Sequence, residues 1–409
     1  MIFHQQNSKN EYLCPSFQVL NTKTDGFIVT SGIKITSMTK IMKLIKDVLF
    51  VLALVITSLT AFSQTKYSNE FLNIGVGARG LAMANTQVSF VDDGTAGYWN
   101  PAGLLSMNSD RQVSLMHAEY FAGIAKYDYG SIAFKFDDKS AGALSIIRFG
   151  VDNIPNTTQL IDNQGNIDYN KITQFSAADY AVIFSYARNL TKIEGLKLGG
   201  NAKIIRRIIG DFSNSWGFGV DVGAQYEYKK WKFGAFARDI TTTFNAWNTT
   251  LDDATKEVFL RTNNEIPSNS LEITMPRLIL GASRTFTFFD KFSVMGAVDL
   301  DITTDGKRNT IIKSKPFSID PHAGIELGYL NTVFIRGGYG NIQQETDFLN
   351  QKSFTGQFNI GVGVVIKKTL TIDYALSDIG DNSIALYSNI FSLRLNLNKK
   401  QTTKNIPSQ

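Results

Sequence analysis

Long segments that alternate apolar and polar residues occupy most of the chain after residue 110, and no other feature constrains the fold as strongly. The last segment covers residues 389–398. It places Phe391, Leu393, Leu395 and Leu397 at one set of alternate positions, and Ser392, Arg394, Asn396 and Asn398 at the other. Because successive side chains of a β-strand point to opposite faces, each set shares one face. The pattern predicts strands that separate an apolar surrounding from a hydrated interior.

About fourteen segments show this pattern, and many of them run to ten residues or more. Their approximate spans are 111–120, 128–136, 141–149, 176–189, 196–207, 216–228, 231–240, 276–286, 291–302, 318–329, 332–340, 355–367, 369–377 and 389–398. Strands of soluble proteins average about 5–6 residues, whereas a tilted strand that crosses a bilayer needs about 9–11. No stretch after residue 63 keeps a helical period. Segment length and alternation therefore both favour strands that cross a membrane.

The connections between these segments alternate in length. Short ones lie at 137–140, 229–230, 330–331 and 368, and longer ones at 150–175, 208–215, 241–275, 303–317, 341–354 and 378–388. Outer-membrane barrels have short periplasmic turns and longer external loops. An open sheet edge in lipid would leave backbone groups unpaired, so such a sheet must close. The sequence therefore predicts an all-β fold, a 14-stranded antiparallel transmembrane β-barrel over residues 111–398.

The polar faces of these strands are expected to line the lumen. They carry both signs of charge, with Asp221, Asp299, Asp301, Asp320, Glu326 and Asp373 against Lys197, Lys203, Arg336, Lys367 and Arg394. One interpretation is a solvated, ion-paired lumen that stabilises the fold, and the other is a translocation path or ligand site. Aromatic residues near strand ends fit either interfacial girdles or ordinary strand packing. They are Tyr226, Tyr228, Trp231, Tyr329 and Tyr339.

The longest apolar run, residues 48–62, follows Lys40, Lys43 and Lys46 and ends in Ala-Phe-Ser. Such an arrangement is typical of a secretory signal peptide. A membrane anchor is the alternative, but its helix needs about 20 apolar residues. We therefore expect cleavage after Ser63 and export to the outer membrane. Residues 1–37 are expected to be an upstream extension or a wrongly assigned start, and residues 38–63 the signal peptide. An N-terminal hatch (64–110), the barrel (111–398) and a polar tail (399–409) are expected to follow.

The composition after residue 63 excludes several classes of function. Cys14 is the only cysteine, so the exported chain has no thiol chemistry. Residues 1–63 hold six of the 41 basic and three of the 36 acidic residues, which leaves a net charge of +2 for the rest. This balance gives no argument for nucleic-acid binding.

Motifs that suggest catalysis or cofactors lack their structural context. Residues 75–80 read Gly-Val-Gly-Ala-Arg-Gly and Asp92 follows, but a dinucleotide site needs βαβ units that this chain does not show. His117 and His322 have no metal-ligand spacing to another histidine or carboxylate, and we expect them to be structural or lumen-facing. Residues 92–95 read Asp-Asp-Gly-Thr, lack the further ligands of a calcium loop, and predict a turn. We expect no catalytic residue, cofactor or metal.

The segment before the barrel is the most distinctive part of the chain. It reads Asn-Glu-Phe-Leu-Asn-Ile-Gly-Val-Gly-Ala-Arg-Gly-Leu-Ala-Met-Ala over residues 69–84 and Val-Asp-Asp-Gly-Thr-Ala-Gly-Tyr-Trp-Asn-Pro-Ala-Gly-Leu over residues 91–104. It resembles the PorV/PorQ family of Bacteroidetes outer-membrane proteins, which is in turn similar to the FadL long-chain fatty-acid transporters. Both place a small hatch ahead of a fourteen-stranded barrel. Both share a stretch that ends in Asn-Pro-Ala-Gly, matched here by Asn100, Pro101, Ala102 and Gly103.

The resemblance implies that these four residues anchor the hatch. Pro101 fixes φ and removes a donor. This chain departs from the Ala-rich pattern of the family around Asp92 and Asp93. We expect the glycines at 94, 97 and 103 to permit tight turns, and those near the aspartates to loosen the hatch.

The resemblance also implies a role in type IX protein secretion, where PorV-like proteins escort cargo that bears a C-terminal signal domain. The implied partners are outer-membrane lipid, other secretion-system proteins and cargo signal domains, with no nucleic acid. The alternative function is a FadL-like outer-membrane channel for hydrophobic small molecules, which needs an apolar pocket in the lumen. A third is a barrel with only a structural role. Periodicity favours none of the three, and the sequence does not predict an oligomeric state.

Overall fold

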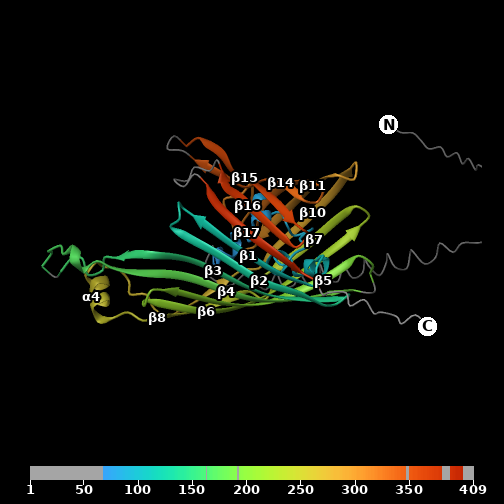
Figure 1. The fold of residues 1–409 in the computed structure, drawn as a ribbon. Coiled ribbons are helices and arrows are strands. Elements are labelled where there is room, and N and C mark those ends of the chain that lie inside the picture. The colour runs from blue at the N-terminus through green and yellow to red at the C-terminus, as the bar shows by residue number, and fades with distance from the viewer. Residues whose placement is uncertain (1–67, 163, 191–192, 347–349, 380–386, 399–409) are drawn as a thin grey trace, which may run out of the picture. The chain divides into compact units, whose positions relative to one another are not determined.

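The computed structural model describes residues 68–398, apart from 163, 191–192, 347–349 and 380–386. The predicted extension 1–37, the signal peptide with its cleavage after Ser63, and the polar tail 399–409 lie outside the described residues. Four short helices come first and strands follow (Figure 1). Among the described residues, no helix has the length and apolarity to cross a membrane.

The hatch comprises four short helical segments whose side chains are mostly buried. They are η1 (Glu70–Asn73), α2 (Ala78–Ala82), α3 (Ala96–Trp99) and η2 (Pro101–Ser106). α2 begins after Gly77, whose φ of +79° favours glycine. η2 begins after Asn100, whose side-chain oxygen accepts a hydrogen bond from the Ala102 N–H, and Pro101 takes the first position. Asparagine and proline both suit the start of a helix, so this sequence fixes where η2 begins.

Seventeen strands form one antiparallel sheet. They are β1 (Arg111–Tyr120), β2 (Ala125–Asp137), β3 (Ser140–Asn156), β4 (Thr173–Asn189), β5 (Leu196–Ile209), β6 (Ser213–Tyr228), β7 (Trp231–Arg238), β8 (Thr243–Thr249), β9 (Ser270–Thr274), β10 (Arg277–Phe288), β11 (Phe292–Thr303), β12 (Ile312–Lys313), β13 (Ser318–Tyr329), β14 (Val333–Thr346), β15 (Lys352–Ile366), β16 (Leu370–Ile379) and β17 (Ser388–Leu397). β6 pairs with both β7 and β8, so these two are parts of one barrel strand. β9 and β10 form another, and β12 is a two-residue strand in a loop.

These merged strands make a closed barrel of fourteen strands, which confirms the predicted fold class. Closure occurs where β1 pairs with β2 on one side and with β17 on the other. Tight hairpins connect the strands at the end that carries Arg111 and Leu397, which we name the turn end. Three of these hairpins have consecutive residues with positive φ, at 289–290, 330–331 and 367–368. That conformation matches the twist of a two-residue hairpin. The opposite end, which carries the longer connections, is the loop end.

Four predicted loops are wrong in extent. β3 and β14 continue to residues 156 and 346, into the predicted loops 150–175 and 341–354. β5 and β6 continue past the predicted loop 208–215, and only residues 210–212 separate them. The predicted loop 241–275 contains β8, the helix α4 (Asp253–Arg261) and β9. The strand breaks have local causes, because Asp239 and Thr242 adopt positive φ and Pro276 has no N–H for a ladder. In Figure 1, β3, β4, β6 and β8 reach past the other strands towards α4.

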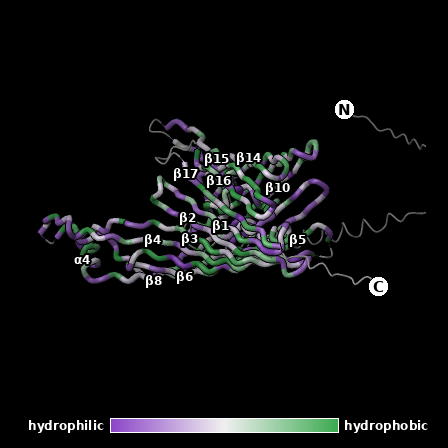
Figure 2. The backbone as a smooth tube through the Cα atoms, viewed as in Figure 1, coloured by the Kyte–Doolittle hydropathy of each residue, from purple (hydrophilic) through white to green (hydrophobic). Residues whose placement is uncertain are grey.

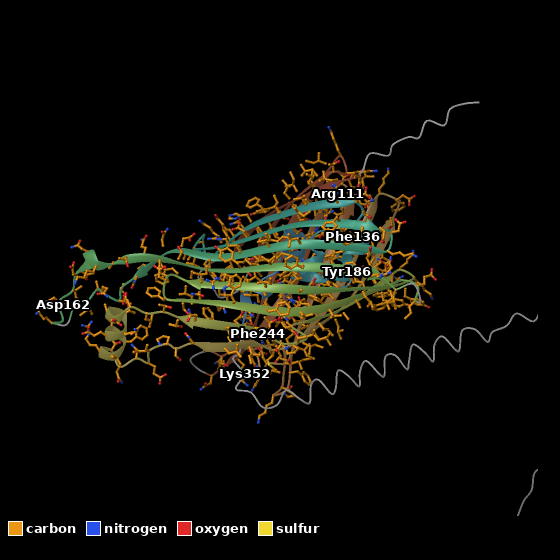
Figure 3. All side chains as sticks on the ribbon, turned by 90° about the horizontal axis from the view of Figure 1, so that it is seen from below. Arg111, Phe136, Asp162, Tyr186, Phe244 and Lys352 are labelled. Carbon is orange, nitrogen blue, oxygen red and sulfur yellow. The ribbon has the colours of Figure 1, made fainter. Side chains whose placement is uncertain are left out.

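The predicted apolar faces of the strands point outward. Hydrophobic and hydrophilic positions alternate along the strands, as Figure 2 shows. Exposed outward residues include Phe358, Ile360, Val362, Val364, Ile366, Ile325, Leu327, Phe391, Leu393 and Leu397. Figure 3 shows Phe136, Tyr186 and Phe244 on the same outer surface. Because an aqueous surface would not tolerate so continuous an apolar band, the outside of the barrel suits lipid.

The predicted inward set is mostly confirmed. Asp221, Asp299, Glu326, Asp373 and Lys203 are buried in the barrel interior. The prediction that Lys367 faces the lumen is wrong, because this residue is exposed in the turn between β15 and β16 with a φ of +50°. Tyr228, Trp231 and Tyr329 lie exposed near the turn end, as an aromatic girdle requires.

Candidate functional site

The glycine motif at residues 75–80 is a packing surface for aromatic side chains of the hatch. A Cβ on Gly80 would lie 2.8 Å from the Trp99 ring, and one on Gly75 would lie 3.1 Å from it. The Trp99 indole N–H donates to the Val76 carbonyl at 3.0 Å, and the Tyr98 hydroxyl donates to the Leu72 carbonyl at 2.6 Å. The glycines are therefore explained by close packing within the hatch, with no need for a bound phosphate.

The Asn-Pro-Ala-Gly stretch joins the hatch to the barrel wall. The fully buried Asn100 amide donates to the Val88 carbonyl at 2.9 Å within the hatch and to the Ala224 carbonyl of β6 at 3.0 Å. Pro101 and Ala102 lie against Gly199 of β5, where a Cβ would come within 2.6 Å of the Ala102 nitrogen. Gly103 packs against the Val91 backbone. These contacts support the anchoring role that the resemblance implies.

Seven inward glycines of the wall, here named the lumenal glycines, allow the hatch backbone to approach the strands. They are Gly199, Gly223, Gly234, Gly281, Gly324, Gly338 and Gly361. A Cβ on Gly361 would lie 2.6 Å from the Ala82 Cβ, and one on Gly324 would lie 2.9 Å from the Met83 Cβ. Glycine within a strand often marks such a close approach of another backbone. At these glycines the hatch backbone and side chains therefore come into close contact with β5, β6, β7, β10, β13, β14 and β15.

The hatch glycines likewise allow close contact between the hatch and its surroundings. This finding corrects our expectation that they loosen the hatch. Gly94, Gly97 and Gly103 do not have positive φ. Cβ atoms on Gly94 and Gly97 would each lie 2.7 Å from a wall serine, Ser114 and Ser185 respectively. Ser131 and Tyr129 donate to the Gly94 carbonyl at 2.9 and 3.0 Å, which tightens this contact.

We expect Gly338→Ala to displace the hatch and Gly337→Ala to be tolerated. A Cβ at 338 would overlap the Met83 backbone, whereas one at the outward neighbour 337 would meet its nearest atom at 3.8 Å. Overpacking of this kind costs about 1–3 kcal/mol. Denaturant titration of both purified variants checks this difference. Equal destabilisation by the two changes would contradict the close fit of the hatch.

A buried ion network holds α2 to the wall. The Arg79 guanidinium forms two hydrogen bonds to the Glu326 carboxylate of β13, at 2.8 and 2.9 Å. Arg336 of β14 donates to the same carboxylate at 2.7 Å and to Asp373 of β16 at 2.6 Å. The side chain of Arg336 is only 2% exposed. Two-point pairing of arginine with carboxylate fixes orientation as well as distance, so the network sets the position of the hatch.

Asp93 makes the second ionic attachment, to Arg394 of β17. Its carboxylate also accepts from the Thr95 N–H at 2.9 Å, which confirms the turn predicted at residues 92–95. Burial by itself would raise the pKa of Asp93, but the guanidiniums of Arg394 and Arg79 lower it further than burial raises it. Asp93 therefore remains ionised well into acid, and the attachment persists there.

A cavity of about 530 Å³ lies between the hatch and the loop end. Hatch residues form one side of it, including Phe71, Tyr98 and Trp99, and loop-end parts of the strands form the others. Arg238 and Arg277, which sit directly opposite each other on β7 and β10, both line it. We name it the lumenal cavity. Asp299, Asp301 and Asp320 of the predicted inward set line it, whereas the two arginines were not in that set.

The charges around the lumenal cavity are largely paired. Arg277 pairs with Asp301. Arg308 pairs with Asp305 at 2.5 Å and with Glu70 of the hatch at 3.0 Å. Five carboxylates and three guanidiniums line the cavity, so its lining has an acidic excess.

A second cavity, of about 520 Å³, is lined largely by apolar side chains beyond the loop end of the lumen. Phe175 of β4 and Phe212 meet edge-to-face there, with ring centroids 5.2 Å apart. Trp247 of β8 and Phe259 of α4 also line it, and the other apolar lining residues are Pro155, Ile209, Leu251 and Pro267. We name it the outer pocket. The sequence offered no signal for it, because its residues come from three separate loop-end connections and the strand ends beside them.

His322 lies on the lumen side, as the sequence suggested, whereas His117 does not. His117 is on the outer surface, where its ring contacts Asp128 at 2.7 Å across the β1–β2 pairing. His322 lies 3.4 Å from Asp320 beside the lumenal cavity. Both histidines therefore have carboxylate neighbours that sequence spacing did not predict. Within the described part of the chain, no group of three or more histidine, cysteine, aspartate or glutamate residues is placed to hold a metal ion.

Comparison with known proteins gives a likeness at the level of the fold. No family model matches the chain, and no curated protein does so. Among solved structures, the CymD monoaromatic hydrocarbon channel is 13% identical with a TM-score of 0.51, over 80% of this chain and 98% of that one. The P. putida toluene transporter TodX is 13% identical with a TM-score of 0.50, over 80% of this chain and 99% of that one. The chain therefore shares the overall β-barrel fold of these two channel proteins.

Proposed function

We propose that the protein is an outer-membrane channel that admits small hydrophobic molecules. The outer pocket is the observation that carries this proposal, because it is an apolar cavity on the loop-end side of a plugged barrel. Barrels of this type expose their longer loops outside the cell. The outer pocket therefore faces the medium from which a substrate arrives, and the lumenal cavity lies further along the same barrel.

The proposal agrees with the functions that appear in the names of the two structurally similar proteins. CymD is named as a monoaromatic hydrocarbon channel and TodX as a toluene transporter. A small aromatic molecule suits the rings of Phe175, Phe212 and Trp247, since aromatic pairs favour edge-to-face and offset contacts.

We expect Phe212→Asp to lower uptake of labelled toluene by at least about tenfold in Gram-negative cells that produce the chain. A carboxylate in this apolar cavity would be poorly solvated, and a loss of about 1.4 kcal/mol in binding already corresponds to tenfold. The control is Phe289→Asp, at a turn-end residue that is 90% exposed. The control should transport normally. If cells that produce the unaltered protein take up no more toluene than cells without it, the channel function is excluded.

We also propose, as a second function, that the protein is a component of type IX secretion. The Asn-Pro-Ala-Gly stretch supports this function, together with the loop-end connection between β8 and β9 that contains α4. Its partners would be secretion-system proteins and cargo signal domains, held by the surface of residues 157–162, residues 164–172 and α4. Co-purification from native outer membrane tests it. Recovery of cargo with the full chain, and its loss when α4 is replaced by a glycine-serine linker, would support this role over transport.

A further inference from the structure

One arginine lies on the outward, apolar face of the barrel near the turn end. Arg284 of β10 alternates in phase with the exposed outward residues Leu280, Phe286 and Phe288. Its direct neighbour across the ladder is Trp231, the first residue of β7 after the β6–β7 turn. Because Trp231 belongs to the aromatic girdle, Arg284 lies at the level of the lipid headgroups.

The Arg284 guanidinium is held between aromatic rings and has no anionic partner. Its Cζ lies 5.2 Å from the centroid of the Trp231 ring and 4.7 Å from that of the Phe286 ring. Among the described residues, none forms an ion pair or a hydrogen bond with this guanidinium. Its Nε is buried, whereas its two terminal nitrogens remain accessible. Stacking on the rings orients the guanidinium in advance, so less freedom is lost when an anion binds.

Arg206 of β5 provides a comparison, because it also lies on the outward face, but at the loop end. Its Cζ lies 4.9 Å from the centroid of the Trp216 ring. It also donates to the Asn214 side-chain oxygen at 2.7 Å and to the Ser215 carbonyl at 3.4 Å. Stacking on tryptophan is therefore common to both arginines, but Arg284 keeps its donors available for a ligand.

The turns beside Arg284 add further positive charge. Lys229 and Lys230 form the β6–β7 turn, and Lys291 lies in the β10–β11 turn. Asp290 is the one acidic residue of these two turns, so together with Arg284 they carry a net charge of +3. Basic clusters beside a membrane attract anionic lipids. The anion that surrounding lipid supplies at this depth is a headgroup phosphate.

The wall between Arg284 and the bilayer centre leaves room for acyl chains. Gly296 of β11 is the other ladder neighbour of Arg284, and a Cβ added to it would meet no atom within 4 Å. Ala282, the next outward residue of β10, lies in register between Phe233 of β7 and Val298 of β11, which are both exposed. Two small residues thus lie beside larger apolar side chains, which an acyl chain can contact.

We infer that Arg284, Trp231 and Phe286 form a binding site for one anionic phospholipid of the periplasmic leaflet. The headgroup phosphate pairs with the terminal nitrogens of Arg284, since guanidinium and phosphate match each other in geometry. The acyl chains lie over Ala282 and Gly296. The site is on the outside of the wall, so the inference does not depend on the proposed channel.

The test is native mass spectrometry of the purified full chain, titrated in detergent with dioleoyl phosphatidylglycerol. We expect the unaltered chain to retain one lipid. Arg284→Gln should lower the affinity about fivefold, the size expected for one basic residue beside a charged lipid. Arg284→Lys should retain most of the affinity, which separates loss of the charge from loss of the fold. Dioleoylglycerol, which has the same chains without the phosphate, should bind equally weakly to the unaltered chain and to Arg284→Gln.

Arg206→Gln is the matched control, since it removes an outward arginine that stacks on tryptophan at the other end of the barrel. This variant should bind phosphatidylglycerol like the unaltered chain. Three results would overturn the inference: an equal loss of affinity in both glutamine variants, equal binding of phosphatidylglycerol and dioleoylglycerol, or failure of the unaltered chain to retain the lipid. Displacement of the lipid by inorganic phosphate would also overturn it, because the site would then recognise the free ion.

Discussion

Ile325→Arg is expected to lower the free energy of unfolding of the barrel by about 2–4 kcal/mol, the cost of a basic residue near the bilayer midplane of a barrel. Ile325 points outward from β13 and is 46% exposed. Its strand neighbours in register are Gly296 of β11 and Gly337 of β14, which provide no polar group to receive the guanidinium. Urea titration of the protein refolded into lipid vesicles measures the change.

Leu330→Arg is the control for this prediction. Leu330 is 50% exposed, close to the value for Ile325, but it lies in the turn between β13 and β14. Exposure in the absence of lipid therefore does not distinguish the two sites. The two sites differ only in their position relative to the membrane, because the turn that carries Leu330 reaches the aqueous interface and residue 325 does not. Similar destabilisation of both variants would mean that the outward face of β13 is not in contact with lipid.

Glu326→Ala is expected to destabilise the docked hatch by about 3–5 kcal/mol, because it leaves two buried guanidiniums without their shared carboxylate. The two cations are Arg79 and Arg336. The hatch should separate from the wall before the barrel unfolds, since β13 and β14 are also held together by their backbone ladder. Trypsin cleavage after Arg79 then increases, while the barrel keeps its resistance to unfolding in detergent.

Glu119→Ala serves as the control for the ionic prediction. Glu119 is half-exposed on the outer surface, with His117 at 3.7 Å. An exposed pair contributes about 0–1 kcal/mol, so this variant should behave like the unaltered chain. If trypsin cleaves after Arg79 at the same rate in both variants, the network around Glu326 does not hold the hatch.

The barrel could be predicted from the sequence because lipid and lumen impose a period of two on every strand. The outward positions of Ile325 and Val362 follow directly from that period. Lys367 was misplaced because alternation continues formally into a turn, where the backbone no longer alternates. The break between β7 and β8 was missed for a related reason, because residues 239–242 keep a mixed composition while their backbone leaves the ladder.

The candidate site could not be predicted, because it depends on residues that are far apart in the chain. Phe71, Arg238 and Arg308 meet in one cavity only after the barrel closes around the hatch. The contact of His117 with Asp128 needs the register of the β1–β2 hairpin, which spacing along the chain does not reveal. The inward glycines were visible in the alternation, but the backbone that approaches them belongs to another segment.

The attachments of the hatch to β17 also bear on how the protein assembles. The Ala78 N–H donates to the Ser392 hydroxyl across 314 positions of sequence, and Asp93 meets Arg394 across 301. β17 is the strand whose pairing with β1 closes the barrel. The hatch residues therefore find these partners only when the last strand arrives, and contacts of such separation form slowly. Insertion into the membrane and seating of the hatch should then be one cooperative event, in which a barrel that closes without its hatch is difficult to repair.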